Sequence, residues 1–229
     1  MTSSGVSCIV LAAGRSSRLG RPKQLLELGG EPLLRHVIRQ ALAADVVEVI
    51  VVLGADADRI ATEVGDMGQR TVVNADFAAG QSTSLFAGVS AMSSAADAAL
   101  FMLGDQPTVG SDVLEAVIGR HSASGARIVL ARYRGRPGNP VLIDSALRSE
   151  LLAVTGDEGA RSVVKRHRDW VEFVDFPDRY VPPDVDTEED YARLKAVWEG
   201  GGVATQVNAI EMERPGFQFG ATPTKLFQG

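Results

Sequence analysis

Short apolar runs alternate along this chain with segments of helical periodicity, and this alternation limits the fold more than any other feature of the sequence. The runs 6–13, 46–53 and 98–103 are almost continuously apolar, which is typical of strands buried on both faces of a sheet. Between them, the segment 32–44 gathers its apolar residues on one face of a helix and begins with Pro32, which suits a first helical position. The pattern predicts an α/β fold: a single domain with a doubly wound, mostly parallel sheet and helices on both faces.

The alternation continues to about residue 131 and then loosens. Up to that point we expect helices over 57–64, 83–92 and 112–121, and strands over 71–74 and 127–131. After it we expect a Gly-, Pro- and Arg-rich loop over 132–140. Thr155 and Glu158 have capping-box spacing, which predicts a helix that follows them and ends near 167. We then expect a strand over 171–176 and a helix over 188–198.

Residues 1–199 are expected to form one domain, and residues 200–229 a tail or linker, because that stretch opens with three glycines and has no periodicity. For the last five residues, 225–229, a remnant of cloning and a natural tail are both open interpretations.

Composition excludes several classes of protein. The chain is 45% hydrophobic and 23% charged, which rules out intrinsic disorder, and its net charge of −6 argues against a general nucleic-acid binder. One cysteine, Cys8, allows no internal disulfide and is expected to be a buried core thiol, and the three histidines show no zinc-binding spacing. No apolar run approaches the ~20 residues of a membrane span, and the first residues lack the basic side chains of a signal peptide. We therefore expect a soluble cytoplasmic protein.

The segment 14–23, directly after the first predicted strand, carries the most specific chemical signal. It holds four basic residues and no acidic one: Arg15, Arg18, Arg21 and Lys23. Ligands of doubly wound sheets bind at the carboxyl ends of strands, small residues let backbone N–H groups approach an anion, and Arg and Lys bind phosphate oxygens. The segment therefore predicts a polyphosphate site, although the spacing of its glycines fits neither the Walker loop nor the dinucleotide fingerprint. A solvated basic turn is the other interpretation.

The stretch LAAGRSSRLGRPKQLL, followed by GGEPLL, resembles the N-terminal signature of the MobA-like nucleotidyltransferases. These share a fold with sugar-phosphate and isoprenoid-precursor nucleotidyltransferases, and the resemblance, over about residues 5–198, is greatest to the molybdenum cofactor cytidylyltransferases. It implies that Arg18 and Lys23 bind phosphates, and that Ala13 favours CTP over GTP. The nucleotide would be held by Leu11, Ala12, Ala13 and Gly14.

Two acidic residues are candidate ligands for Mg²⁺, which prefers one or two carboxylates together with substrate phosphates. Asp105 follows a buried strand in a tight Gly-Asp-Gln-Pro turn, and the resemblance makes the aspartate at this position a metal ligand. Asp186 lies in the segment DVDTEEDY, which also resembles a family motif. Asp186 is either a second metal ligand or part of a cap formed by Thr187 and Asp190 at the start of a helix.

The resemblance also suggests further contacts with substrates. Asp76, Ser82 and Ser84 would lie near the nucleotide, although Ser82 and Ser84 also suit the cap of a helix. The segment 136–140 would face the acceptor. A solvated turn is the other interpretation of this segment. The candidate acceptor residues are Arg136, Gly138 and Asn139, with Arg132 and Arg134 as further cations for an acceptor phosphate. The segment 156–161, GDEGAR, is common in the cytidylyltransferase branch, but its sequence does not indicate a role.

These features predict a Mg²⁺-dependent nucleotidyltransferase that transfers CMP from CTP to the phosphate of molybdopterin cofactor and releases pyrophosphate. Arg18, Lys23 and Asp105 are the expected catalytic residues. A molybdoenzyme or a chaperone is a possible partner, and no nucleic acid or membrane is expected. The other hypotheses are a relative that uses GTP or a sugar phosphate, an NAD(P)H-dependent oxidoreductase and a non-catalytic chaperone for the cofactor.

Overall fold

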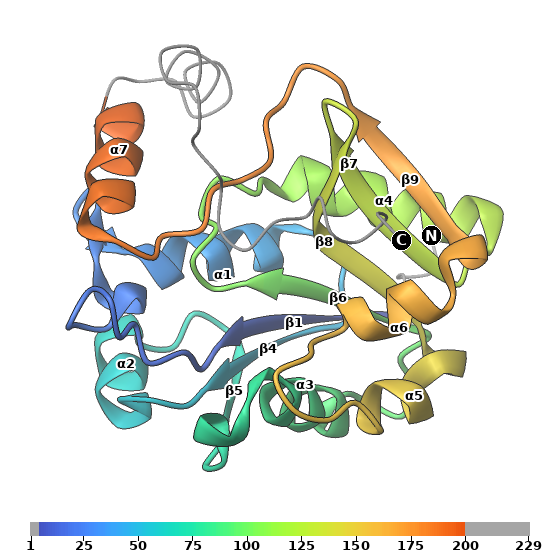
Figure 1. Ribbon diagram of the computed structural model, residues 1–229, viewed down its shortest axis with the longest axis horizontal. Coiled ribbons are helices and arrows are strands. Elements are labelled where there is room, and N and C mark those ends of the chain that lie inside the picture. The colour runs from blue at the N-terminus through green and yellow to red at the C-terminus, as the bar shows by residue number, and fades with distance from the viewer. Residues whose placement is uncertain (1–4, 200–229) are drawn as a thin grey trace.

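Seven strands form one sheet in the order β5-β4-β1-β6-β8-β7-β9, and helices cover both of its faces (Figure 1). The computed structural model describes residues 5–199, so the expected tail over 200–229 lies outside the described residues. The strands of the sheet are β1 (Val6–Ala12), β4 (Glu48–Leu53), β5 (Arg70–Val73), β6 (Ala98–Leu103), β7 (Ile128–Tyr133), β8 (Arg136–Asp144) and β9 (Val171–Phe176). The small strands β2 (Glu27–Leu28) and β3 (Glu31–Pro32) pair separately.

All the described helices except the last one lie in the connections between strands, and the last one follows β9. They are α1 (Leu33–Ala43), α2 (Ala57–Val64), α3 (Gln81–Ala91), α4 (Ser111–Ser124), α5 (Arg148–Leu152), α6 (Arg161–Arg166) and α7 (Glu188–Glu199), with single 3₁₀ turns η1 (Lys23–Leu25), η2 (Phe77–Ala79), η3 (Ser145–Leu147) and η4 (Arg168–Trp170). Strand β8 runs antiparallel to β6 and β7, and the other neighbouring pairs in the sheet run parallel. The predicted α/β fold with a mostly parallel sheet is confirmed.

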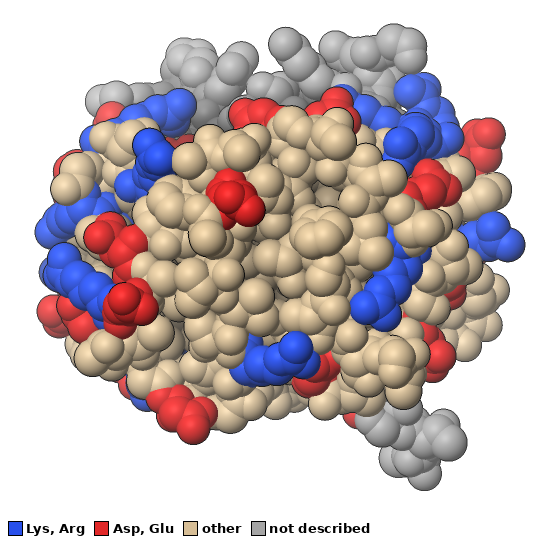
Figure 2. Space-filling view, turned by 90° about the horizontal axis from the view of Figure 1, so that it is seen from below, with Lys and Arg blue, Asp and Glu red and all other residues tan. Residues whose placement is uncertain are grey.

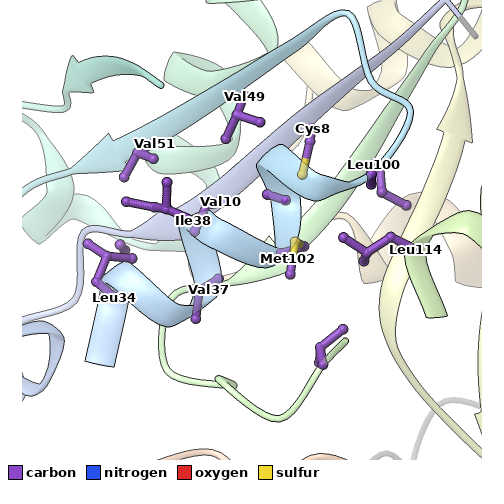
Figure 3. Close-up of a cluster of buried hydrophobic side chains, with 14 of the residues drawn as sticks. Cys8, Val10, Leu34, Val37, Ile38, Val49, Val51, Leu100, Met102 and Leu114 are labelled. Carbon is purple, nitrogen blue, oxygen red and sulfur yellow. The ribbon is translucent and has the colours of Figure 1, made fainter. Parts of the chain in front are cut away.

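Alternate residues of each central strand face two separate cores. On β1, Cys8 and Val10 pack beneath α1, as Figure 3 shows, while Ile9 joins a second core formed with α3, α5 and α6 on the opposite face. All three side chains are fully buried, and burial of Val10 and of Ile9 contributes roughly 1.5–3 kcal/mol each to stability. Cys8 is the buried core thiol that was expected, and burial raises its pKa to about 12, so the thiol stays protonated at neutral pH.

The expected loop over 132–140 is wrong, because most of it belongs to a β-hairpin. Strand β7 continues to Tyr133, Arg134 and Gly135 turn the chain with positive φ angles of 47° and 79°, and β8 begins at Arg136. The Gly- and Pro-rich start of β8 pairs with β7 alone, since β6 pairs with β8 only from Val141 onward. Proline is tolerated where a strand has a neighbour on one side only, which explains how this composition fits a strand.

The helix expected after Thr155 begins later than predicted and lacks the predicted cap. Helix α5 ends at Leu152 and α6 begins at Arg161, with no side-chain hydrogen bond at its N-cap. The intervening segment binds another helix instead: the Gly156 carbonyl accepts from the backbone N–H of Ser82 in α3, at 3.2 Å. The cap predicted at α7 is confirmed, because the side chains of Thr187 and Asp190 each accept a hydrogen bond from the other's backbone N–H.

Figure 2 views the molecule from below, from the side of α2, α3 and α5, and its middle is largely free of charged side chains. The described residues of this face therefore do not form the broad basic patch that nucleic-acid binders present. Among residues 5–199, none of the helices has the length and apolar character needed to cross a membrane.

Candidate active site

A cavity of about 540 Å³ opens at the carboxyl ends of β1 and β6, next to the start of α3. This is where a doubly wound sheet binds its ligands, and the volume is in the range of small-molecule sites. Residues 11–15, Lys23 and Asp105 form one side, which we call the loop wall. Residues 157 and 159–161, from the connection between α5 and α6, also line the cavity, and we call the segment 156–161 the segment wall.

Two backbone N–H groups of the loop wall have no backbone carbonyl as partner among residues 5–199. The Gln24 side-chain amide donates to the carbonyls of Ala12 (2.7 Å) and Gly14 (3.3 Å). In a trans peptide the N–H points away from the carbonyl, so the N–H groups of Ala13 and Arg15 face away from Gln24. Within residues 5–199 these two N–H groups donate to no backbone carbonyl. Backbone N–H groups at a strand end are suitable donors to phosphate oxygens.

Lys23 joins this loop to two carboxylates that are distant in sequence. Its ammonium group lies 2.5 Å from Asp105 Oδ2 and 2.9 Å from Asp186 Oδ1. The Lys23 and Asp105 side chains are 17% and 11% exposed, so little water screens their interaction. Burial alone would lower the pKa of Lys23, but the attraction of Asp105 and Asp186 outweighs it and raises the pKa above its usual value. Lys23 therefore remains a cation at any pH at which the protein works.

A third carboxylate, Asp184, belongs to this cluster and was not predicted from the sequence. It lines the cavity, and its Oδ1 accepts from the side-chain amide of Gln106 at 2.8 Å. Gln106 in turn accepts from the amide of Asn139 at 3.0 Å. Burial, followed by repulsion from Asp105, raises the pKa of Asp184 to about 7. The sequence signal was the Asp-x-Asp spacing of Asp184 and Asp186, of which only the second was selected.

The basic residues of the segment 14–23 divide between the cavity and its rim. Arg15 lines the cavity, with its guanidinium 5.1 Å from the ring centre of Phe77. Arg18 does not line the cavity: its side chain is 72% exposed and contacts Asp186 at 3.5 Å. Arg21 forms a bidentate ion pair with Glu188 at the start of α7. Of these residues, Lys23 and Arg15 are already in the cavity, and Arg18 reaches it only through Asp186.

The predicted nucleotide contacts near α3 are only partly brought to the cavity. Ser84 lines it, whereas Ser82 and Asp76 do not. The backbone N–H of Ser82 is used to bind Gly156, and the N-cap of α3 is Gly80, without a side-chain cap. The cap expected from the serines is therefore absent, because glycine at this position allows the segment wall to pack against the start of the helix.

Only one of the three predicted acceptor residues lines the cavity. Asn139 lines the cavity beside Gln106, but Arg136 and Gly138 do not. Gly138 packs against the ring of Tyr133, because both belong to the hairpin of β7 and β8. The other two arginines have partners elsewhere: Arg132 pairs with Asp175 of β9 at 2.6 Å. Arg134 lies over the ring of Tyr180, with its guanidinium 4.3 Å from the ring centre.

The carboxylates of this cluster fit a divalent cation. Asp105 and Asp186 already converge on one positive charge, the Lys23 ammonium, and both supply the hard oxygen ligands that Mg²⁺ and Mn²⁺ prefer. Among residues 5–199, no three His, Cys, Asp or Glu side chains are grouped so that they alone could hold a metal. A site with two carboxylates that is completed by substrate phosphates is the usual arrangement for Mg²⁺.

Comparison with known proteins assigns most of this chain to a family. A family model described as the MobA-like NTP transferase domain matches residues 8–170. The chain belongs to this family of nucleotidyltransferases. The matched region of the MobA-like domain includes the loop wall, Asp105 and the segment wall, and it ends before Asp184 and Asp186.

Relatives of this MobA-like protein carry different names. The chain is 36% identical over 197 residues to nicotine blue oxidoreductase from Paenarthrobacter nicotinovorans, which covers 82% of this chain and 96% of that protein. It is 25% identical over 193 residues to molybdenum cofactor cytidylyltransferase from Escherichia coli, covering 84% and 96%. The structure of Rv0371c from Mycobacterium tuberculosis in complex with manganese has a TM-score of 0.73 and 32% identity, covering 83% and 98%. The family resemblance inferred from the sequence is confirmed.

Proposed function

We propose that this MobA-like protein is a metal-dependent cytidylyltransferase that transfers CMP from CTP to the phosphate of a molybdopterin-type acceptor. The observation that carries the proposal is the position of Lys23. It binds both Asp105 and Asp186, and it follows a loop in which the N–H groups of Ala13 and Arg15 have no backbone acceptor among the described residues. The identity with the Escherichia coli cytidylyltransferase over most of both chains supports the choice of reaction. Ala13 in the Leu-Ala-Ala-Gly start of the loop supports CTP as the nucleotide.

The reaction needs no strong base. An oxygen of the acceptor phosphate attacks the α-phosphorus of CTP, the bond from that phosphorus to the bridging oxygen breaks, and pyrophosphate leaves with the electron pair. A phosphate monoester is largely ionised near pH 7, so the attacking oxygen is already an anion. The protein contributes positioning and charge stabilisation, as it does in phosphoryl transfer generally.

Each element of the loop wall has a part in this reaction. The N–H groups of Ala13 and Arg15 bind the triphosphate, and Lys23 neutralises the charge that grows on the departing pyrophosphate. Arg18 supports this role from outside the cavity, through its contact with Asp186. Asp105 and Asp186 would hold Mg²⁺ or Mn²⁺, which neutralises phosphate charge when bound. Since Lys23 bridges the same carboxylates, its ammonium group would lie beside a cation that they hold.

Hydride transfer is the second candidate, because the relative named nicotine blue oxidoreductase is 36% identical over nearly its whole length. The loop after β1 lacks the three-glycine spacing that binds a dinucleotide pyrophosphate, which counts against this function. An oxidoreductase of this kind would bind NADPH or NADH and oxidise it in the presence of an electron acceptor such as nicotine blue, whereas the transferase would release pyrophosphate.

The direct test is release of pyrophosphate from CTP in the presence of molybdopterin. We expect wild-type turnover, and a loss of about 10²–10³-fold or more in both Lys23→Ala and Asp105→Asn, since each removes charge stabilisation from the transition state. Lys195→Ala and Asp58→Asn are the controls, because each removes a charge of the same sign at an exposed position of a helix away from the cavity. Both should keep wild-type rates. Full activity of Lys23→Ala and Asp105→Asn, with unchanged circular dichroism, would contradict the proposal.

A further inference from the structure

The segment wall is firmly attached to the start of α3. In Figure 1 the connection from α5 to α6 runs beneath the sheet and past α3. The Gly156 carbonyl accepts from the Ser82 N–H, and the Asp157 carboxylate accepts from the Gln81 N–H at 3.3 Å. Gly80 packs so closely against Gly156 that a side chain there would collide with its backbone. These contacts hold the wall, and the residues that follow it, beside the cavity.

Three basic side chains among the described residues line the cavity: Arg15, Lys23 and Arg161. Lys23 is held by two carboxylates, and Arg15 belongs to the loop wall, where it packs over Phe77. Arg161, the first residue of α6, lies in the segment wall and is exposed. Its guanidinium has no carboxylate partner among residues 5–199. It is therefore a cation that faces a substrate cavity with its hydrogen-bond donors available.

A transferase that joins two phosphorylated substrates must balance the charge of both. The loop wall and Lys23 serve the triphosphate in the proposed function, which leaves the second phosphate to be accounted for. Of the arginines that the sequence offered for it, Arg132 is paired with Asp175, Arg134 lies over Tyr180, and Arg136 is outside the cavity.

We propose that Arg161 binds the phosphate of the acceptor and thereby selects phosphorylated acceptors. The proposal rests on the proposed transferase function. An arginine can donate two parallel hydrogen bonds to one phosphate, so it fixes the orientation of the acceptor as well as its charge. Asp157, which also lines the cavity, accepts a hydrogen bond from the Gln81 N–H at the start of α3, and this contact reduces its repulsion of an incoming anion.

The experiment compares wild type with Arg161→Ala, Arg161→Lys and the control Lys165→Ala. Lys165 is an exposed cation of the same helix that does not line the cavity. In calorimetric titrations with CTP and Mg²⁺, we expect the same Kd for all four proteins. In pyrophosphate release at saturating CTP, we expect Arg161→Ala to raise KM for molybdopterin by about tenfold or more, Arg161→Lys to fall between it and wild type, and Lys165→Ala to match wild type.

A second titration separates this proposal from the proposed function. Inorganic phosphate is added to each protein saturated with CTP and Mg²⁺, and its binding is followed by calorimetry. If no protein turns over molybdopterin, tighter phosphate binding by wild type than by Arg161→Ala still supports an anion site at Arg161. Equal phosphate binding by these two proteins, or an equal KM for molybdopterin, would overturn the proposal. A weaker CTP affinity in Arg161→Ala would also overturn it, since Arg161 would then serve the nucleotide.

Discussion

The two walls of the cavity are assembled in different ways. The loop wall comes mainly from one short stretch of chain, residues 11–24, in which the strand end, the loop and Lys23 follow one another. The segment wall lies about 140 residues further along, and its place depends on packing against the start of α3. Binding groups encoded within one local segment can be recognised from the sequence, whereas those placed by long-range packing require the structure.

The largest effect is expected from breaking the joint between α3 and the segment wall. In Gly80→Ala, the new Cβ would clash with the backbone of Gly156, 2.7 Å from its carbonyl carbon, at a φ of +120° that alanine disfavours. We expect a loss of about 3 kcal/mol of stability and a raised KM for the acceptor, measured by urea denaturation and steady-state kinetics.

Gly119→Ala is the matched control, because its Cβ would meet nothing within 4 Å in the middle of α4. It should leave kinetics unchanged and raise stability by up to about 1 kcal/mol. Equal stability of Gly80→Ala and wild type would show that α3 and the segment wall are not joined at this glycine.

A smaller effect is expected from loosening the loop wall. Gln24→Ala removes the donor to the carbonyls of Ala12 and Gly14, which frees the loop to turn its N–H groups away from the phosphates. We expect a loss of about 1–3 kcal/mol of stability and a weaker affinity for CTP, with the acceptor KM little changed. Gln69→Ala, which removes a side-chain bond to the carbonyl of Gly65 outside the cavity, should not alter CTP affinity. Calorimetry that finds wild-type CTP affinity in Gln24→Ala would contradict this role.

The smallest effect concerns Asp184, the carboxylate that lines the cavity and binds Gln106. The pKa of Asp184 is about 7 in the folded protein, above its ordinary value of 3.8, so the folded state holds this proton more tightly than the unfolded state. The stability that this proton contributes is fully present below about pH 4, where Asp184 is protonated in both the folded and the unfolded state. It is lost as the pH rises to 7 and stays lost above that. Asp184→Asn stays neutral and should be more stable than wild type at pH 8, by at least about 1 kcal/mol.

Urea denaturation in metal-free buffer at several pH values checks this expectation. The advantage of Asp184→Asn should shrink steadily as the pH falls from 7 to 5. A difference between the two proteins that does not change with pH would mean that Asp184 titrates near its ordinary value.

Sequence alone predicted the fold because each central strand is apolar on both faces, a pattern that parallel sheets require. It also predicted that Lys23 and Asp105 lie in one site, since both follow strands whose carboxyl ends are neighbours. It failed for β8, because glycine and proline normally indicate loops, and here they occupy a stretch paired on one side only. It failed for Arg161 and Asp184 because their positions depend on contacts with Ser82 and Gln106, far away in the chain.

The most direct test of the central claim is calorimetric titration of the full chain with CTP, GTP and NADPH, each with and without Mg²⁺. We predict that CTP binds, that Mg²⁺ tightens its binding, and that Lys23→Ala weakens it, since the ammonium group and the metal both neutralise the triphosphate. GTP should bind more weakly, and NADPH should not bind. Binding of NADPH without binding of either triphosphate would contradict the transferase and favour the oxidoreductase.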